Sequence, residues 1–264
     1  MKKEEIIAKI RQRNSFLVVD LNPDMDKMPP QYRDTSSLAG SVYDYLREVA
    51  SITNPYAVAY RLNLGYYLAL GQIGTFLLAN VIEWIKKELT NSFVILDANV
   101  GDIPIATAKY AKAFFEGYKA DAVTVNPFFG KDCLQPFLKK DDAWIIVTAL
   151  SSNSGSFDFQ WTEENGEPLY KKVIEAEIPG SDSENTIYGV SQDMLSEVRR
   201  LRPNHFLFVP EFTGKWEQVK NSVIPGDCGL LIAVKNLIFD SSPDFDRNIE
   251  LKTRNIVNKM REIL

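Results

Sequence analysis

Eight short apolar runs recur along the chain with amphipathic stretches between them, and this alternation limits the fold more than any other feature. Short continuous apolar runs are typical of strands that are buried on both faces, as in a parallel sheet. We predict strands at Phe16–Leu21, Ala57–Leu62, Phe93–Leu96, Ala122–Asn126, Ala143–Thr148, Thr186–Val190, His205–Val209 and Gly229–Ala233. The helical patterns between them include Thr75–Leu89, Ile105–Tyr118 and Gln192–Leu201. This order indicates an α/β fold, and eight strands favour a closed (β/α)8 TIM barrel over an open doubly wound sheet.

The length and charge of the chain agree with one such barrel. The 264 residues match its usual size, so we expect a single domain over residues 1–264. The net charge of -5 argues against a nucleic-acid partner, because phosphate binding over a wide surface needs a basic face. No apolar run is long enough to span a bilayer and the start carries no signal-peptide core, so we expect a cytoplasmic protein without a membrane partner. Cys133 and Cys228 are expected to be reduced and buried, and the single histidine disfavours a zinc site.

Polar residues follow the predicted strands, at the ends where barrels carry their functional groups. They are Asp20, Asn22 and Asp24; Arg61 and Asn63; Asp97, Asn99 and Asp102; Asn126; Ser151, Ser152 and Asn153; Pro210 to Lys215; and Lys235 and Asn236. Any one of them could simply cap a helix or form a turn. As a ring around one barrel mouth they indicate a binding site. The longest irregular stretches we predict are Ser151–Pro168, which follows a strand end, and Ile178–Asn185.

The segment after the third predicted strand holds the densest group of these residues. Asp97 and Asp102 flank Asn99. Two carboxylates that face one pocket repel each other and raise one pKa unless a cation lies between them. Arg61, at the end of the second strand, is our candidate for that cation. The structural alternative is that Asp102 forms the N-cap of the helix that follows.

The spacing Asp97-x-Asn99-x-x-Asp102-Ile resembles the Asp-x-Lys-x-x-Asp-Ile signature of the orotidine 5′-phosphate decarboxylase family. The similarity extends over nearly the whole chain and is greatest to the longer bacterial branch of the family. It is carried by Ser15–Leu21, Tyr56–Gly71, Asp121–Leu138, Leu150–Gln160, His205–Pro210 and Cys228–Leu231. The resemblance implies a barrel of the ribulose-phosphate-binding type, a pyrimidine nucleotide ligand, a dimer, no metal and no cofactor.

The resemblance also implies a mechanism, in which an alternating Lys-Asp-Lys-Asp array surrounds the reacting carbon. One Asp faces the substrate carboxylate, the signature Lys stabilises and protonates the carbanion, and the last Asp comes from the partner subunit. In this chain the array becomes Arg61, Asp97, Asn99 and Asp102. Asn99 is neutral and has no labile acid proton, and arginine is a very poor proton donor. We expect this change to cost several orders of magnitude in rate and to raise the pKa of at least one of the two acids.

The phosphate site that the resemblance implies at the last two strands is altered in the same way. The loop Pro210–Trp216 places Glu211 where an anion should approach, and it lacks most of the glycines that a backbone cradle needs. The last strand is followed by Val234–Asn236, which has no arginine fork. Lys215 or Lys235 could supply a weaker charge. The other candidate contacts to the ligand are Asn22, Asn63, Asn126, Ser152 and Asn153.

We therefore predict a catalytically impaired homologue of this family. One alternative is an active lyase that uses a rearranged site on orotidine 5′-phosphate or another phosphorylated substrate, with Asp97 and Asp102 holding a magnesium ion. Another is a non-catalytic nucleotide-binding or regulatory subunit, either a homodimer or paired with an active paralogue. Trp216 lies beside the altered loop and could plug the pocket, but we expect it and His205 to pack structurally.

Overall fold

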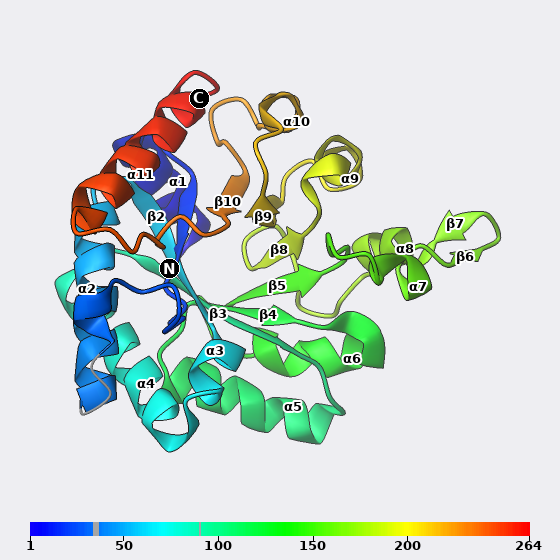
Figure 1. Cartoon of the computed structure of the whole chain (residues 1–264). Coiled ribbons are helices and arrows are strands. Elements are labelled where there is room, and N and C mark those ends of the chain that lie inside the picture. Colours follow the sequence, from blue (N-terminus) through cyan, green and yellow to red (C-terminus); the bar gives the residue numbers. More distant parts are fainter. Residues whose placement is uncertain (34–36, 90) are drawn as a thin grey trace.

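The computed structural model describes residues 1–33, 37–89 and 91–264, and it contains a closed barrel of eight parallel strands (Figure 1). These strands are β1 (Leu17–Asp20), β2 (Ala57–Asn63), β3 (Phe93–Val100), β4 (Ala122–Val125), β5 (Trp144–Thr148), β8 (Thr186–Gly189), β9 (Phe206–Phe212) and β10 (Leu230–Val234). Around the barrel they follow the order β1-β10-β9-β8-β5-β4-β3-β2. The predicted (β/α)8 barrel is confirmed.

Helices connect the strands and cover the outside of the barrel (Figure 1). They are α1 (Lys3–Arg13), α2 (Leu38–Thr53), α3 (Leu64–Leu68), α4 (Gly71–Glu88), α5 (Pro104–Ala111), α6 (Lys131–Leu134), α7 (Ser156–Phe159), α8 (Leu169–Glu175), α9 (Leu195–Leu201), α10 (Trp216–Lys220) and α11 (Phe245–Arg261). Short 3-10 turns lie at η1 (Pro30–Tyr32), η4 (Pro127–Phe129), η5 (Gln135–Leu138) and η6 (Gln192–Met194), and η3 (Lys112–Gly117) is π-helical. The predicted helix Ile105–Tyr118 is therefore divided between α5 and η3. None of the helices in the described ranges is long and apolar enough to cross a membrane.

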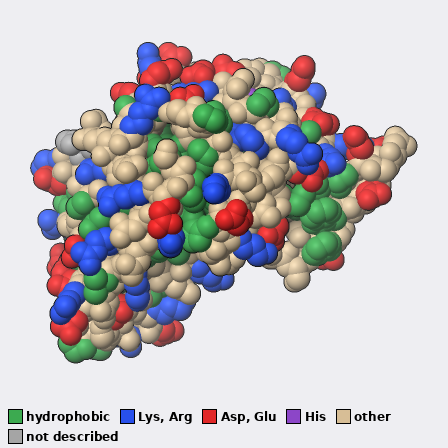
Figure 2. Space-filling model, turned by 90° about the horizontal axis from the view of Figure 1, so that it is seen from above, with side chains coloured by type: hydrophobic (Ala, Val, Ile, Leu, Met, Phe, Trp, Pro, Cys, Tyr) green, Lys and Arg blue, Asp and Glu red, His purple; other side chains and the backbone are tan. Residues whose placement is uncertain are grey.

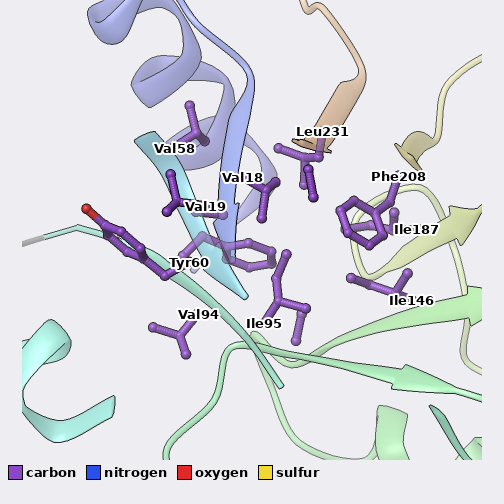
Figure 3. Packing of buried hydrophobic residues seen from close by; sticks show 14 of the residues in the cluster. Val18, Val19, Val58, Tyr60, Val94, Ile95, Ile146, Ile187, Phe208 and Leu231 are labelled. Atoms are coloured by element: carbon purple, nitrogen blue, oxygen red, sulfur yellow. The ribbon is translucent and has the colours of Figure 1, made fainter. Parts of the chain in front are cut away.

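The core is built from the apolar strand residues, which are buried whichever face they occupy. Val18, Ile95, Ile146, Phe208 and Leu231 are all essentially inaccessible to solvent and lie together in the barrel interior (Figure 3). Each large apolar side chain removed from water stabilises the fold by about 1.5–3 kcal/mol. The strands therefore need no alternation of polar and apolar residues, and this explains why the sequence shows them as continuous runs.

One strand extends further than its apolar run predicts. In the pairing of β3 with β4, Leu96 is opposite Val123 and Val100 is opposite Val125. Four residues of β3 therefore span the same length as two residues of β4. The extra residues form a bulge in which Asn99 has a left-handed backbone with φ 46°. Bulges re-aim side chains at barrel rims, and this one directs the segment after Asp97 toward the barrel mouth.

The predicted irregular stretch Ser151–Pro168 contains regular structure. It holds α7 and a small hairpin outside the barrel, formed by β6 (Glu163–Glu164) and β7 (Glu167–Pro168) (Figure 1). The turn between these strands is Asn165-Gly166, and both residues have positive φ. An Asn-Gly pair between two short strands is a strong hairpin signal, because a two-residue hairpin turn requires this conformation. The expectation of an irregular loop there was wrong.

Candidate functional site

A cavity of about 380 Å³ opens at the carboxyl ends of the barrel strands. Its charged lining consists of Asp20, Lys27, Arg61, Asp97, Glu211 and Lys235. Its neutral polar lining includes Asn22, Asn63, Asn99, Thr124, Thr148, Ser151, Ser152 and Asn153. The cavity therefore brings together eight of the predicted site residues: Arg61, Asp97, Asn99, Asn22, Asn63, Ser152, Asn153 and Lys235.

The floor of the cavity is a group of three charged side chains from β1, β2 and β3. Asp20 is directly opposite Arg61 in the strand register. The Arg61 guanidinium donates from Nε to Asp20 Oδ1 and from Nη2 to Asp20 Oδ2, both at 2.6 Å. The contact from Arg61 Nη1 to Asp97 Oδ2 is longer, at 3.8 Å. Arg61 therefore lies beside Asp97 as predicted, but its two-pronged grip is taken by Asp20, and Asp102 does not line the cavity.

Burial changes the pKa values of Asp20 and Arg61. It raises the pKa of Asp20 above its usual value, and the charge and hydrogen bonds of Arg61 oppose that shift. Burial also disfavours the charged form of Arg61, but the charge and hydrogen bonds of Asp20, together with the charges of Asp97 and Glu211, raise the pKa of Arg61 overall. Arg61 therefore stays charged and is unsuited to giving up a proton.

Asp97 is held by neutral donors on both of its oxygens. Thr124 Oγ1 donates to Asp97 Oδ1 at 2.7 Å, and Asn63 Nδ2 donates to Asp97 Oδ2 at 2.8 Å. Asn63 and Asp97 are opposite one another in the register of β2 and β3, which explains the second bond. The carboxylate is buried, with 8% of the residue exposed. It is fixed at the position where the family resemblance expects the group that faces the substrate carboxylate.

Asn99 is fixed through its backbone and its side-chain oxygen. Its backbone N–H donates to Thr124 Oγ1 at 2.9 Å, and its Oδ1 accepts from Thr148 Oγ1 at 2.6 Å. Asparagine tolerates the left-handed backbone that the bulge requires better than a long side chain does. The position of the signature lysine thus holds a neutral amide.

Asp102 lies outside the cavity lining. Its Oδ1 accepts from the Ile103 backbone N–H at 2.7 Å, while its backbone oxygen accepts from Thr107 Oγ1 at 2.8 Å. Helix α5 begins at Pro104 with Ile103 as its N-cap, so Asp102 is not the N-cap residue that the structural alternative proposed. Asp102 precedes the helix and is half-buried beside it.

Asn126 serves the fold at the end of β4. Its Oδ1 accepts from the Phe128 backbone N–H at 3.0 Å and caps η4. Its backbone oxygen would lie 2.4 Å from a Cβ on residue 101, and this close approach explains why Gly101 occupies that position. Asn126 does not line the cavity, so the structure does not bring it to the other predicted ligand contacts.

The rim of the cavity at β9 and β10 carries an ion pair. Lys235 Nζ lies 3.3 Å from Glu211 Oε1, and Ser152 Oγ donates to Glu211 Oε2 at 3.4 Å. In the pairing of β9 with β10, Val209 is opposite Ile232 and Phe212 is opposite Val234. The extra residue in β9 forms a bulge around Glu211. This bulge turns the Glu211 carboxylate toward Lys235 and the cavity.

The other cation predicted for the phosphate, Lys215, lies elsewhere. Its Nζ is 2.7 Å from Asp193 Oδ1, and it is not part of the cavity lining.

Trp216 packs edge-on against Phe212 with ring centroids 4.6 Å apart, so its predicted packing role is confirmed. His205 packs beside Tyr188, and burial lowers its pKa to about 4.

Three asparagines have their side-chain oxygens bound by the protein. Asn22 Oδ1 accepts from the Asn63 backbone N–H at 2.7 Å, and Asn153 Oδ1 accepts from Ser151 Oγ at 2.6 Å. Asn99 has the same arrangement with Thr148. Each oxygen anchor fixes the direction of the corresponding NH2 group, and none of these three groups donates to another described residue.

Sequence reasoning missed two members of the site. Asp20 was placed at the barrel mouth but left out of the charged array, although its position at the end of the first apolar run put it level with Arg61. Lys27 lines the cavity from the loop after β1 and is paired with Asp24 at 2.7 Å. Lys27 follows no strand directly, so no periodic signal marked it. In the described part of the chain, no group of three or more His, Cys, Asp or Glu side chains could hold a metal ion.

A closed parallel barrel with a polar, charge-lined mouth is the architecture of the (β/α)8 enzymes and their relatives. A sequence model of the Orotidine 5′-phosphate decarboxylase / HUMPS family matches residues 34–204. The chain is 33% identical over 273 residues to an orotidine 5′-phosphate decarboxylase of Bacteroides fragilis, covering 100% of this chain and 98% of the relative. It is 35% identical over 268 residues to one of Christiangramia forsetii, with 98% and 97% covered. The chain belongs to the orotidine 5′-phosphate decarboxylase family.

Solved structures agree with this assignment. The Leishmania donovani OMP decarboxylase superposes with a TM-score of 0.79 at 26% identity, with all of both chains covered. The Plasmodium berghei orotidine 5′-monophosphate decarboxylase superposes with a TM-score of 0.80 at 19% identity, covering 99% of each chain, and shows the shared fold.

Proposed function

We propose that this chain is a member of the family that does not decarboxylate orotidine 5′-phosphate at a useful rate. The observation that carries the proposal is the state of Arg61 and Asn99. Arg61 keeps its charge in a two-pronged bond with Asp20, and Asn99 is a neutral amide. A nascent carbanion at this floor would have neither a free cation to stabilise it nor an ammonium group to protonate it.

The remaining cations of the described lining do not replace the missing lysine. Lys27 and Lys235 both lie at the rim, and each is paired with a carboxylate, Asp24 and Glu211 respectively. Asp97 already accepts two hydrogen bonds from neutral donors, one on each carboxylate oxygen. Electrostatic stabilisation by one preorganised group is worth about 10²–10³ in rate, and here several groups are changed together.

A magnesium-dependent lyase has less support in this geometry. Such a site would need oxygen ligands from both Asp97 and Asp102. Both oxygens of Asp97 are occupied, and Asp102 points to the start of α5 instead of the cavity. The arrangement favours the non-catalytic interpretation.

The proposed ligand is a pyrimidine nucleotide or nucleoside, and the proposed partner is a second copy of the chain. The support for a partner is a set of exposed apolar side chains on α3, α4, α5 and the turn after β4. Figure 1 shows these helices on one side of the barrel. Phe76, Ile105 and Phe128 are 68%, 74% and 78% exposed there. Patches of this kind are typical of protein interfaces. Positive and negative side chains are interspersed on the face shown in Figure 2, which gives no basic field for nucleic acid.

Turnover by the purified chain tests the proposal. The loss of near-ultraviolet absorbance of orotidine 5′-phosphate should not exceed that of an Asp97→Asn variant, because Asp97 belongs to the floor that any decarboxylation here would use. A wild-type rate well above the variant would overturn the proposal. Sedimentation of wild-type and Phe76→Asp protein tests the partner separately, with a dimer expected for the first and a monomer for the second.

A further inference from the structure

We infer that the cavity selects an uncharged, acceptor-rich ligand of the nucleoside class over the same ligand carrying a 5′-phosphate. This inference rests on the proposed loss of decarboxylation, and it assigns the ligand class of the same site. It follows from two independent properties of the lining: its cations are already paired within the protein, and three of its asparagines present NH2 groups that donate to no described residue.

The first property is the balance of charge. The described lining contains three cations, Lys27, Arg61 and Lys235, and each has a carboxylate partner at 2.7, 2.6 and 3.3 Å respectively. A phosphate dianion that entered the cavity would have to displace one of these carboxylates or lie beside it. Like charges in contact oppose binding, and a cation that is already paired gains little from a second anion.

The rim shows this competition most directly. Lys235 is the cation on the side of the cavity where the family resemblance places the phosphate. Glu211 accepts from Ser152 and faces Lys235, so its carboxylate occupies the approach to the ammonium group. An uncharged 5′-hydroxyl does not meet this repulsion and can accept or donate a hydrogen bond at the same place.

The second property is the set of free donors. The side-chain oxygens of Asn22, Asn99 and Asn153 are bound by Asn63, Thr148 and Ser151, and their NH2 groups donate to no described residue. All three residues line the cavity. A ligand rich in carbonyl and hydroxyl oxygens would satisfy these donors without bringing charge. Each asparagine is already oriented, so little side-chain entropy is lost on binding.

Apolar side chains complete the site for a planar ring. The lining includes Ile146, Leu150, Phe208, Leu237, Ile238 and Phe239. An uncharged heterocycle buries against such surface, while its exocyclic oxygens meet the amide donors. The lining therefore offers apolar surface for the ring of a nucleoside and hydrogen-bond donors for its oxygens, without requiring a charge on the ligand.

Calorimetric titration of the wild-type protein with uridine and with uridine 5′-monophosphate tests the inference. We expect uridine to bind at least as tightly as the monophosphate. Monophosphate affinity about tenfold or more above that of uridine would overturn it, and so would the absence of binding by uridine. Neither probe carries a carboxylate to lose, so the result does not depend on turnover. Rapid decarboxylation with a uridine preference would contradict the proposed function alone, and monophosphate preference without turnover would contradict this inference alone.

A pair of variants identifies the residue responsible. Glu211→Gln keeps the shape of the side chain but frees Lys235, so monophosphate affinity should rise about tenfold while uridine affinity changes by less than about twofold. The matched control is Asp193→Asn, which frees Lys215 outside the cavity and should leave both affinities unchanged. An unchanged preference in Glu211→Gln would contradict the role of Glu211, and an equal rise in the control would attribute the effect to net charge.

Discussion

The two sides of the cavity hold their charges in opposite ways. On the floor, Arg61 is enclosed with Asp20, and the two side chains are 9% and 18% exposed. On the rim, the side chains of Lys235 and Glu211 are 60% and 44% exposed. The floor group, Asp20, Arg61 and Asp97, is fixed by strand register and burial. The rim pair, Glu211 and Lys235, is held by a bulge and surrounded by solvent.

The difference in burial predicts that the floor charges contribute to folding stability, whereas the rim charges can change with little effect on it. A buried ion pair compensates the loss of hydration of both partners, so removing one partner leaves a costly isolated charge. An exposed pair is screened by water and contributes little to stability. Substitutions on the floor should therefore change folding, whereas those on the rim should change mainly which ligand binds.

The largest effect is expected when Arg61 is replaced. Arg61→Met leaves Asp20 and Asp97 without a cation, and removing one partner of a buried pair costs about 3–5 kcal/mol in the free energy of unfolding. Urea unfolding measures this change. The control is the double variant Asp20→Leu/Arg61→Met, which removes both charges and should recover most of the stability. Equal destabilisation in both proteins would show that the charges on the floor are not coupled.

A smaller loss is expected at Thr124, which links β3 and β4. Its hydroxyl donates to Asp97 and accepts from the Asn99 backbone N–H. Thr124→Val keeps the shape but leaves two polar groups unsatisfied, at a cost of about 1–3 kcal/mol for each that stays out of water. Thr124→Ser retains the hydroxyl and is the matched control. If the valine and serine variants unfold at the same urea concentration, these hydrogen bonds do not support the floor.

The floor should also respond to pH. Burial raises the pKa of Asp20 in the folded protein above its usual value of 3.8. At pH values between the unfolded and the folded pKa of Asp20, the folded state binds more protons than the unfolded state. The free energy of unfolding therefore falls as pH rises through this range. The stability advantage of wild type over Asp20→Asn should be greatest at low pH and decline as pH increases above about 4. An advantage that grows with pH over this range would mean that the attraction of Arg61 outweighs burial.

The smallest effect on stability is expected at the rim. Glu211→Gln and Lys235→Gln each break a pair that is mostly exposed, so the free energy of unfolding should change by less than about 1 kcal/mol. Differential scanning calorimetry at low and high salt measures the unfolding temperatures of these rim variants, which are compared with that of Arg61→Met. A rim variant as unstable as the floor variant would remove the distinction between the two sides.

The sequence was sufficient for the barrel because its strands are buried on both faces and stand out as continuous apolar runs. It was insufficient where backbone geometry decides which side chains meet. The bulge that extends β3 through Val100 and the close packing of Gly101 on Asn126 direct Asp102 away from Arg61. The pairing of Asp20 with Arg61 depends on the register of two strands that are far apart in sequence.

The central claim is that the floor has no ammonium group able to protonate a carbanion, and single-turnover chemistry tests it most directly. With the enzyme in large excess over orotidine 5′-phosphate, weak binding and slow product release no longer hide the chemical step. We predict that wild type and Asn99→Ala form uridine 5′-monophosphate equally slowly, at the rate seen without protein. Rapid product formation by wild type that is lost in Asn99→Ala would contradict the account.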